Sequence, residues 1–471
     1  MYLSHLSHYT TYLKNISPTV MDSSSIHIVM YPWFAIGHIT AYVHLANKLA
    51  NKGNKISFII PKGTISKLSH FNHFPDLITF VPITVPHVDG LPHGAETTLD
   101  IPFSLNSLLM TAFDLTQKEI ELLLVDLKPS IVFFDTAFWL PNLTRNLNVK
   151  CVTVLYWVIT SPTASFFEYT VRKSNGNDEV EYPGSSSIKL HAHQARAMDV
   201  ILKNEFGSGI SLYERIRRAS TMTDAIGFKG CREIEGPNAD YVGNVYRKPV
   251  LLSGPVLPEP QTSTLEEKWS SWLGKFKAGS VIYVALGSEW VLEQNQFQEL
   301  VLGLELTGFP FLAALKAPLG FESVEAALPD GFKERVQGRG VVHGGWVQQT
   351  LILKHPSIGC FITHCGSGSM VEALVSQCQL VLLPNIFDQI ITAKLISTTF
   401  KAGVEVQRGE EDGLFSKESV SEAVITAMNE ESDVGKEIKV NHTKLRTLLL
   451  SEDLESTYVD SFNHKLHELL G

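Results

Sequence analysis

Short apolar runs rich in β-branched residues alternate with helical patterns along most of the chain, and this alternation restricts the fold more than any other feature. In the first half the apolar runs occupy 26–31, 55–60, 77–85, 130–135 and 149–157. Apolar residues at helical spacing occupy 41–53 and 105–127 between them. Strands that are apolar on both faces and separated by helices indicate a parallel sheet with helices on both sides.

A second series of the same kind follows a stretch rich in proline and small polar residues at 247–264. Its apolar runs occupy 280–288, 311–316, 340–346, 357–365, 379–385 and 403–407, with helical patterns at 293–306, 416–429 and 453–470. A chain of 471 residues also exceeds one ordinary core. We therefore predict two doubly wound α/β domains, with ligands at the carboxyl ends of the strands.

The composition excludes several classes of protein. Hydrophobic residues make up 44% and charged residues 19%, as in globular proteins. A net charge of −10 and the absence of a basic run argue against a nucleic-acid partner. The five cysteines form no disulfide framework, and neither a signal peptide nor an apolar run of about 18 residues is present. We expect a cytoplasmic protein without a membrane span, and a disordered extension at 1–20.

The segment FITHCGSGSMVEAL (361–374) places a Gly/Ser turn between an apolar run and a helical pattern. Such a turn points unpaired N–H groups and a positive helix end outward, which suits a phosphate. The helix dipole supplies only about 0.3 to 2 kcal/mol, so donors from His364 and Ser369 must add to it. A tight turn without a ligand is the alternative. A dinucleotide-binding loop is disfavoured because Val371 replaces its third glycine, which argues against an NAD-dependent dehydrogenase.

The wider segment 346–389 resembles the signature box of plant family 1 glycosyltransferases, which use UDP-sugars. The matching residues are Trp346, Gln349, His355, Gly359, Phe361, His364, Cys365, Gly366, Ser369, Glu372, Pro384, Asp388 and Gln389. The resemblance runs from about residue 21 to the end. It implies a GT-B fold, in which two Rossmann-like doubly wound domains face a central cleft.

The resemblance also implies which segments of the chain bind the acceptor and which bind the donor. Residues 21–250 would form the domain that binds the acceptor and carries out catalysis, and residues 251–265 the linker. Residues 266–452 would bind the UDP-sugar, and the helix at 453–471 would pack back on the first domain. We expect a monomer whose partners are a UDP-sugar donor and a small-molecule glycoside acceptor.

Roles in donor binding follow from the same resemblance. The residues implied for the base and ribose are Trp346, Val347, Gln349 and Glu372. Those implied for the diphosphate are Ser288, His364 and Ser369, and those for the donor sugar are Asp388 and Gln389. The turn residues Gly366, Ser367 and Gly368 complete the predicted donor site. Taken singly, each has a structural alternative: a core indole, a helix-surface carboxylate or a turn residue.

The chain departs from the family pattern after His-Cys-Gly, where Ser367 and Gly368 replace the usual Trp and Asn. This change leaves the donor sugar open: glucose fits Gln389, but rhamnose, xylose or another pentose remains an alternative. The small pair resembles the branch that extends sugars already attached to flavonoids or terpenoids. The segments PWFAIGH, HVDGLPHGAETTLDIP and GGWVQQ resemble that branch too.

The resemblance places the catalytic base at His38, on the loop leaving the first strand, and its acidic partner at Asp135. An imidazole with a pKa near 6.5 can remove the proton of an acceptor hydroxyl, and a carboxylate can orient it and stabilise the imidazolium. A structural role for either residue is the alternative. We expect inversion at the anomeric carbon without a metal or other cofactor.

The acceptor side of the cleft would include Phe34, Ile36, His87 and Phe138. The segment 86–94 offers His87, Asp89 and His93, which we interpret as a loop at the acceptor mouth rather than a metal site. The predicted reaction adds a sugar to the sugar of a flavonoid or anthocyanin 3-O-glycoside. The alternatives are a terpenoid or steroid glycoside acceptor, or a binding protein without catalysis.

Overall fold

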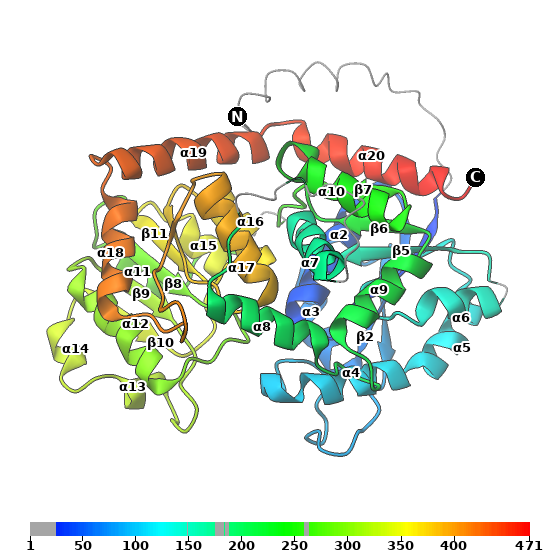
Figure 1. The fold of residues 1–471 in the computed structure, drawn as a ribbon, viewed down its shortest axis with the longest axis horizontal. Helices are drawn as coiled ribbons and strands as arrows, with labels where there is room; N and C mark the ends of the chain where they lie inside the picture. Colours follow the sequence, from blue (N-terminus) through cyan, green and yellow to red (C-terminus); the bar gives the residue numbers. More distant parts are fainter. Residues whose placement is uncertain (1–24, 148, 175–182, 184–187, 259–262) are drawn as a thin grey trace.

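The computed structural model describes residues 25–147, 149–174, 183, 188–258 and 263–471. The extension expected at 1–20 lies outside the described residues. Two α/β domains lie side by side, as Figure 1 shows. The prediction of a GT-B fold with two Rossmann-like domains is confirmed.

The first domain is built on a seven-stranded parallel sheet with the order β3-β2-β1-β4-β5-β6-β7. Its strands are β1 (His27–Tyr31), β2 (Lys55–Pro61), β3 (Ile78–Ile83), β4 (Ile131–Phe134), β5 (Val152–Trp157), β6 (Ala225–Phe228) and β7 (Val250–Leu252). Its helices are α2 (Ile36–Ala50), α3 (Ile65–Leu68), α4 (Asn106–Leu115), α5 (Gln117–Leu127), α6 (Leu140–Asn146), α7 (Ser161–Ser174), α8 (Ala192–Lys203), α9 (Leu212–Met222) and α10 (Arg232–Tyr246).

The second domain has a six-stranded parallel sheet with the order β10-β9-β8-β11-β12-β13. Its strands are β8 (Val281–Ala285), β9 (Phe311–Ala314), β10 (Gly340–His343), β11 (Ile358–Thr363), β12 (Gln379–Leu382) and β13 (Val404–Glu405). Its helices are α11 (Glu267–Leu273), α12 (Gln294–Leu306), α13 (Val324–Ala327), α14 (Phe332–Arg335), α15 (Gln349–Leu353), α16 (Ser367–Val375), α17 (Phe387–Lys394), α18 (Lys417–Met428) and α19 (Asp433–Leu449).

Side chains of each central strand alternate between two apolar layers, as the period of a strand requires. In β1, Ile28 and Met30 belong to the core under α2, whereas Val29 and Tyr31 belong to the core under α4 to α6. The strands of the second sheet divide in the same way. Both faces of both sheets are therefore buried, which explains why the strand sequences are continuously apolar.

The strand order reverses direction between β1 and β4 in the first sheet, and between β8 and β11 in the second. Open parallel sheets bind ligands beyond the carboxyl ends of the strands at such switch points. The residues that follow these four strands therefore mark where a site belongs in each domain.

The last helix, α20 (Leu454–Glu468), crosses back to the first domain (Figure 1). Its Phe462 and Leu466 enter the core of that domain. Its Asn463 accepts a hydrogen bond of 2.7 Å from the Asn54 side chain.

The sequence pattern did not reveal β6, β7 or helices α7 to α10. Strand β7 contains only three residues and extends into the range 251–265 that we expected to be the linker. Leu251 and Leu252, which we expected in the linker, belong to this strand.

Candidate active site

The carboxyl ends of β1 and β4 bring His38 and Asp135 together. His38 lies in the first turn of α2, and Asp135 directly follows β4. Because these two strands are neighbours in the sheet, the imidazole Nδ1 lies 2.7 Å from Asp135 Oδ2. The His38 side chain is 28% exposed and the Asp135 side chain 3%. A substrate can therefore reach the imidazole, whereas the carboxylate is shielded behind it.

The other carboxylate oxygen of Asp135 is held by the backbone. Asp135 Oδ1 accepts hydrogen bonds from the amides of Trp33, at 2.8 Å, and Thr136, at 2.5 Å. The Thr136 hydroxyl donates a third bond at 3.2 Å. These donors fix the carboxylate so that Oδ2 faces the histidine.

Charges from both domains act on His38. Burial alone would lower the pKa of the imidazole, but the hydrogen bond and charge of Asp135 outweigh it. The charges of Glu289 and Asp388 add to this effect, so the pKa lies above its ordinary value. Burial in turn raises the pKa of Asp388 to about 6, against the opposing charge of His38. The site therefore combines a histidine from one domain with carboxyls from the other.

Glu289 is a residue of this site that the sequence reasoning missed. It follows Ser288 in the loop after β8, and its Oε1 accepts a hydrogen bond of 2.6 Å from Thr98 of the first domain. Its position directly after the strand-end serine was the available signal, but its partner lies 191 positions away along the chain.

The turn between β11 and α16 holds His364 in a narrow space. A side chain on Gly366, the N-cap of α16, would lie 2.5 Å from His364 Nε2, and one on Gly287 would lie 2.6 Å from it. Gly287 also has a positive φ of 78°, so only glycine suits both demands. Burial lowers the pKa of His364 to about 4. The imidazole is therefore neutral at physiological pH.

Next to this turn, Glu372 lies in a hydrogen-bonded cluster. Its two carboxylate oxygens accept bonds of 2.6 Å from Gln349 and from the Thr350 hydroxyl. The Gln349 amide also donates to Ser369 Oγ at 3.1 Å, and Tyr283 donates to Gln349 at 3.3 Å. The structure thus brings together three predicted residues, and Thr350 is a member that the sequence reasoning missed.

Other predicted donor residues surround this cluster with different exposure. The Trp346 indole is 75% exposed, whereas Val347 beside it is buried. Ser288 and Gly368 are exposed, and Ser367 is half-buried at the start of α16. The Trp346 indole, Ser288 and Gly368 are therefore accessible from the solvent.

Asp388 and Gln389 lie in the first turn of α17. Gln389 Oε1 accepts bonds from the amides of Asn385, at 3.0 Å, and Ile386, at 3.3 Å, and so caps its own helix. The Phe387 ring stacks on Phe167 of the first domain at 4.1 Å between ring centroids. This contact ties the start of α17 to the domain that carries His38.

The residues predicted for the acceptor side do not share one surface. Phe34 is fully buried among Tyr31 and Phe113, so its assignment to the acceptor surface is wrong. The apolar ring turns into the core instead of the cleft. Ile36, at the first position of α2, is half-buried against the core.

Two further residues were predicted for the same side. His87 is exposed and its ring stacks on His93 at 4.5 Å. Phe138 is half-buried, and the guanidinium groups of Arg215 and Arg218 lie 4.9 and 5.6 Å from its ring centre.

Across the described parts of the chain, no three His, Cys, Asp or Glu side chains gather in a way that could hold a metal ion. Within the same residues, no helix is both long and apolar enough to cross a membrane.

The sequence of this chain is similar to those of known proteins. The family described as UDP-glucoronosyl and UDP-glucosyl transferase matches residues 331–446. The chain is 55% identical to cyanidin 3-O-galactoside 2''-O-xylosyltransferase of Actinidia chinensis, over 96% of this chain and 100% of the relative. It is 53% identical to anthocyanidin 3-O-glucoside 2''-O-glucosyltransferase of Ipomoea nil, over 96% of this chain and 99% of that enzyme.

Solved structures support the fold. A UDP-glucosyltransferase from Polygonum tinctorium superposes with a TM-score of 0.76 at 21% identity, over 95% of this chain and 100% of the other. A UDP-glucose: anthocyanidin 3-O-glucosyltransferase in complex with UDP gives 0.75 at 22% identity, over 95% and 99%. Both sequence and fold therefore lead to one conclusion: the chain belongs to the plant family 1 UDP-dependent glycosyltransferases, enzymes that transfer a sugar from a UDP-sugar donor.

Proposed function

We propose that this chain transfers a sugar from a UDP-sugar to a hydroxyl of the sugar already attached to an anthocyanin or related flavonoid 3-O-glycoside. The His38–Asp135 pair beyond the ends of β1 and β4, which interacts electrostatically with Asp388 of the other domain, is the observation that carries the proposal. The two relatives at 55% and 53% identity, each named for extending a 3-O-glycoside, support the acceptor class.

In the proposed reaction His38 is the general base. Its Nδ1–H donates to Asp135, which leaves the Nε2 lone pair to accept the proton of the acceptor hydroxyl. The hydroxyl oxygen then forms a bond to the anomeric carbon while the bond from that carbon to the diphosphate breaks. Attack from the side opposite the diphosphate inverts the anomeric configuration. Asp135 stabilises the imidazolium that forms.

The departing UDP would be held by the second domain. Backbone N–H groups at the start of α16 and the Ser369 hydroxyl would bind the diphosphate. His364, neutral because of its lowered pKa, would donate one hydrogen bond. Trp346 would stack on the base, and Glu372 would accept from the ribose hydroxyls.

The donor sugar would contact Asp388 and Gln389. The two relatives use different donors, one being named a xylosyltransferase and the other a glucosyltransferase. Glucose and xylose differ in one CH₂OH group, so the space beside Ser367 and Gly368 would decide between them. We propose these two sugars as the donors to test first.

The test is incubation with UDP-glucose or UDP-xylose and either cyanidin 3-O-glucoside or free cyanidin. We expect a product one sugar heavier from the glucoside, with an NMR-assigned linkage between the two sugars, and little product from free cyanidin. Preferential transfer to the aglycone would refute the proposed acceptor. UDP binding without any turnover would instead indicate a binding protein.

A further inference from the structure

A buried ion pair lies behind the turn that carries Asp135. The Arg215 guanidinium of α9 bonds both carboxylate oxygens of Asp114 of α4, at 2.9 and 2.7 Å. The Arg215 side chain is 1% exposed and that of Asp114 10%. Burying two charges is costly unless their remaining hydrogen-bonding groups are satisfied, so the surroundings of this pair matter.

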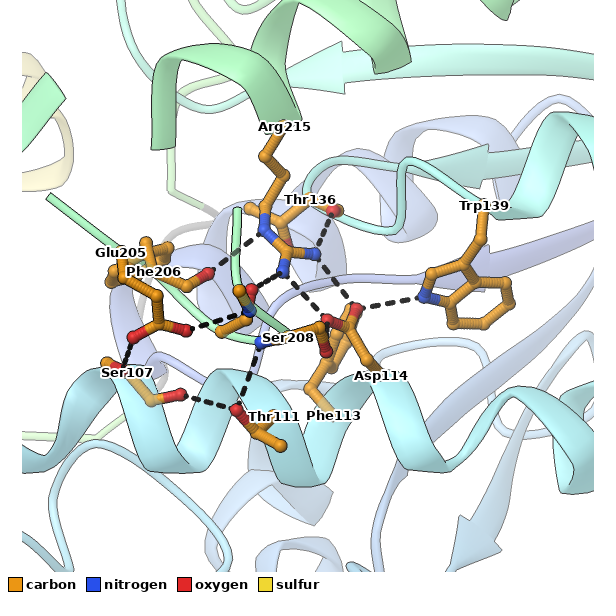
Figure 2. A network of polar contacts seen from close by, with 12 residues as sticks. Ser107, Thr111, Phe113, Asp114, Thr136, Trp139, Glu205, Phe206, Ser208 and Arg215 are labelled. Atoms are coloured by element: carbon orange, nitrogen blue, oxygen red, sulfur yellow. Dashed lines mark hydrogen bonds and ion pairs between the residues drawn. The ribbon is translucent and has the colours of Figure 1, made fainter. Parts of the chain in front are cut away.

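The pair contacts the turn Asp135–Trp139 at three points, of which Figure 2 shows the two hydrogen bonds, to Thr136 and from Trp139. Arg215 donates to the Thr136 carbonyl at 3.3 Å, and its guanidinium lies over the Phe138 ring. The Trp139 indole N–H donates to Asp114 Oδ1 at 2.9 Å. Thr136 is also the residue whose amide and hydroxyl hold Asp135. Thr136 therefore connects the Arg215–Asp114 ion pair to the Asp135 carboxylate, which faces His38.

A second route reaches Asp135 from the loop before α9. Arg215 donates to the carbonyls of Phe206, at 3.2 Å, and Gly207, at 3.1 Å. The Phe206 ring packs edge-on against Trp33 at 6.2 Å, and the Trp33 amide is the other backbone donor to Asp135 Oδ1. The two backbone amides that donate to Asp135, those of Trp33 and Thr136, are therefore both connected to the Arg215–Asp114 ion pair.

We propose that Asp114 and Arg215 are positioning residues, which hold the Asp135 turn so that its carboxylate stays aligned with His38. This inference rests on the roles proposed for His38 and Asp135. Both side chains are almost fully buried, so they would act through Thr136 and Trp33 rather than by direct contact with a substrate. A displacement of about 1 Å in a catalytic group can lower a rate about 100-fold, so an ion pair at this distance can matter for turnover.

The direct test is an NMR titration of the His38 ring, assigned by the loss of its signal in His38→Ala. The groups that act on His38 are Asp135, Glu289 and Asp388. In Arg215→Met, a displaced Asp135 raises the His38 pKa less, so the titration midpoint falls below that of the wild type. This readout needs no acceptor, so it remains valid even if the proposed acceptor is wrong.

A second variant covers the case in which Arg215→Met does not fold, because that change leaves Asp114 buried without its partner. Trp139→Phe removes a single donor to Asp114 and keeps an aromatic ring. The matched control is Arg172→Met, which breaks the ion pair of Arg172 with Glu168 elsewhere in the same domain.

Kinetics then complete the test. We expect kcat to fall about 10- to 100-fold in Arg215→Met and less in Trp139→Phe, with KM for the UDP-sugar unchanged. Arg172→Met should match the wild type in both readouts. A wild-type His38 midpoint and wild-type kcat in Trp139→Phe, or an equal loss in Arg172→Met, would overturn the proposal.

Discussion

Two histidines lie where central strands of the two sheets end, yet their environments are opposite. His38 of the first domain has a carboxylate at 2.7 Å, and its pKa lies above the ordinary value. His364 of the second domain is packed between two glycines, and burial lowers its pKa to about 4. The raised pKa of His38 favours its protonated form, whereas the lowered pKa of His364 keeps that imidazole neutral.

The difference teaches that the neighbouring carboxylate, rather than burial, decides what each histidine can do. A buried imidazole without an anionic partner loses the stabilisation of its charged form. Asp135 restores that stabilisation for His38. The role proposed for His38, a base that gains a proton, needs such a partner, whereas the role proposed for His364, a hydrogen-bond donor to a diphosphate, does not.

The largest expected effect comes from removing the base. His38→Ala should lower kcat by about 10²- to 10⁴-fold, while the affinity for UDP measured by calorimetry stays near the wild-type value. The two effects should separate because the proposed base and the proposed nucleotide site belong to different domains. A loss of UDP affinity as large as the loss of rate would contradict this separation.

Replacing the carboxylate of Asp135, the partner of His38, with an uncharged amide should cause the second-largest loss of activity. Asp135→Asn should lower kcat about 100-fold, within the range for general-base catalysis. Activity is lost as the pH falls through the His38 pKa, because the protonated imidazole cannot accept a proton. Without Asp135 that pKa falls, so the acid limb of kcat/KM, measured from pH 5 to 9, should move to lower pH. An unmoved limb would show that Asp135 does not set the pKa.

Removing the second histidine should affect binding instead of proton transfer. His364→Ala should weaken UDP binding about 10- to 100-fold, as expected for one lost hydrogen bond to a charged group. Because the pKa of His364 is about 4, this loss should be the same at pH 6 and pH 8. Calorimetry at the two pH values checks this, and a strong pH dependence would mean that His364 carries charge.

The smallest effect concerns the donor sugar. Ser367→Trp combined with Gly368→Asn restores the usual family pair. No neighbouring atom lies within 4 Å of a Cβ added at Gly368, so the start of an asparagine side chain meets open space. We expect the ratio of kcat/KM for UDP-glucose over UDP-xylose to change about twofold to tenfold, the range for one hydrogen bond. Identical donor ratios in the variant and the wild type would remove these positions from donor selection.

Much of the fold could be predicted from the chain because strands buried on both faces are continuously apolar. The predicted core elements around β1, β4, β8 and β11 lie where the pattern placed them. Strand β6 and helices α7 to α10 in the region 158–246 were not predicted; α10, for example, contains Pro237, a residue that a sequence pattern marks as a helix breaker. Phe34 was misassigned because an aromatic residue in a loop can turn to the core or to the cleft.

The sequence alone determined which residues stand at the strand ends, His38, Asp135 and His364 among them, because parallel sheets bring those ends to one edge. Only the tertiary structure decided which distant residues act on them. Thr98 meets Glu289, and Asp114 meets Arg215, across separations of 191 and 101 positions. Such partners follow from how helices pack on the sheets and how the two domains face each other, and no local pattern of residues encodes that packing.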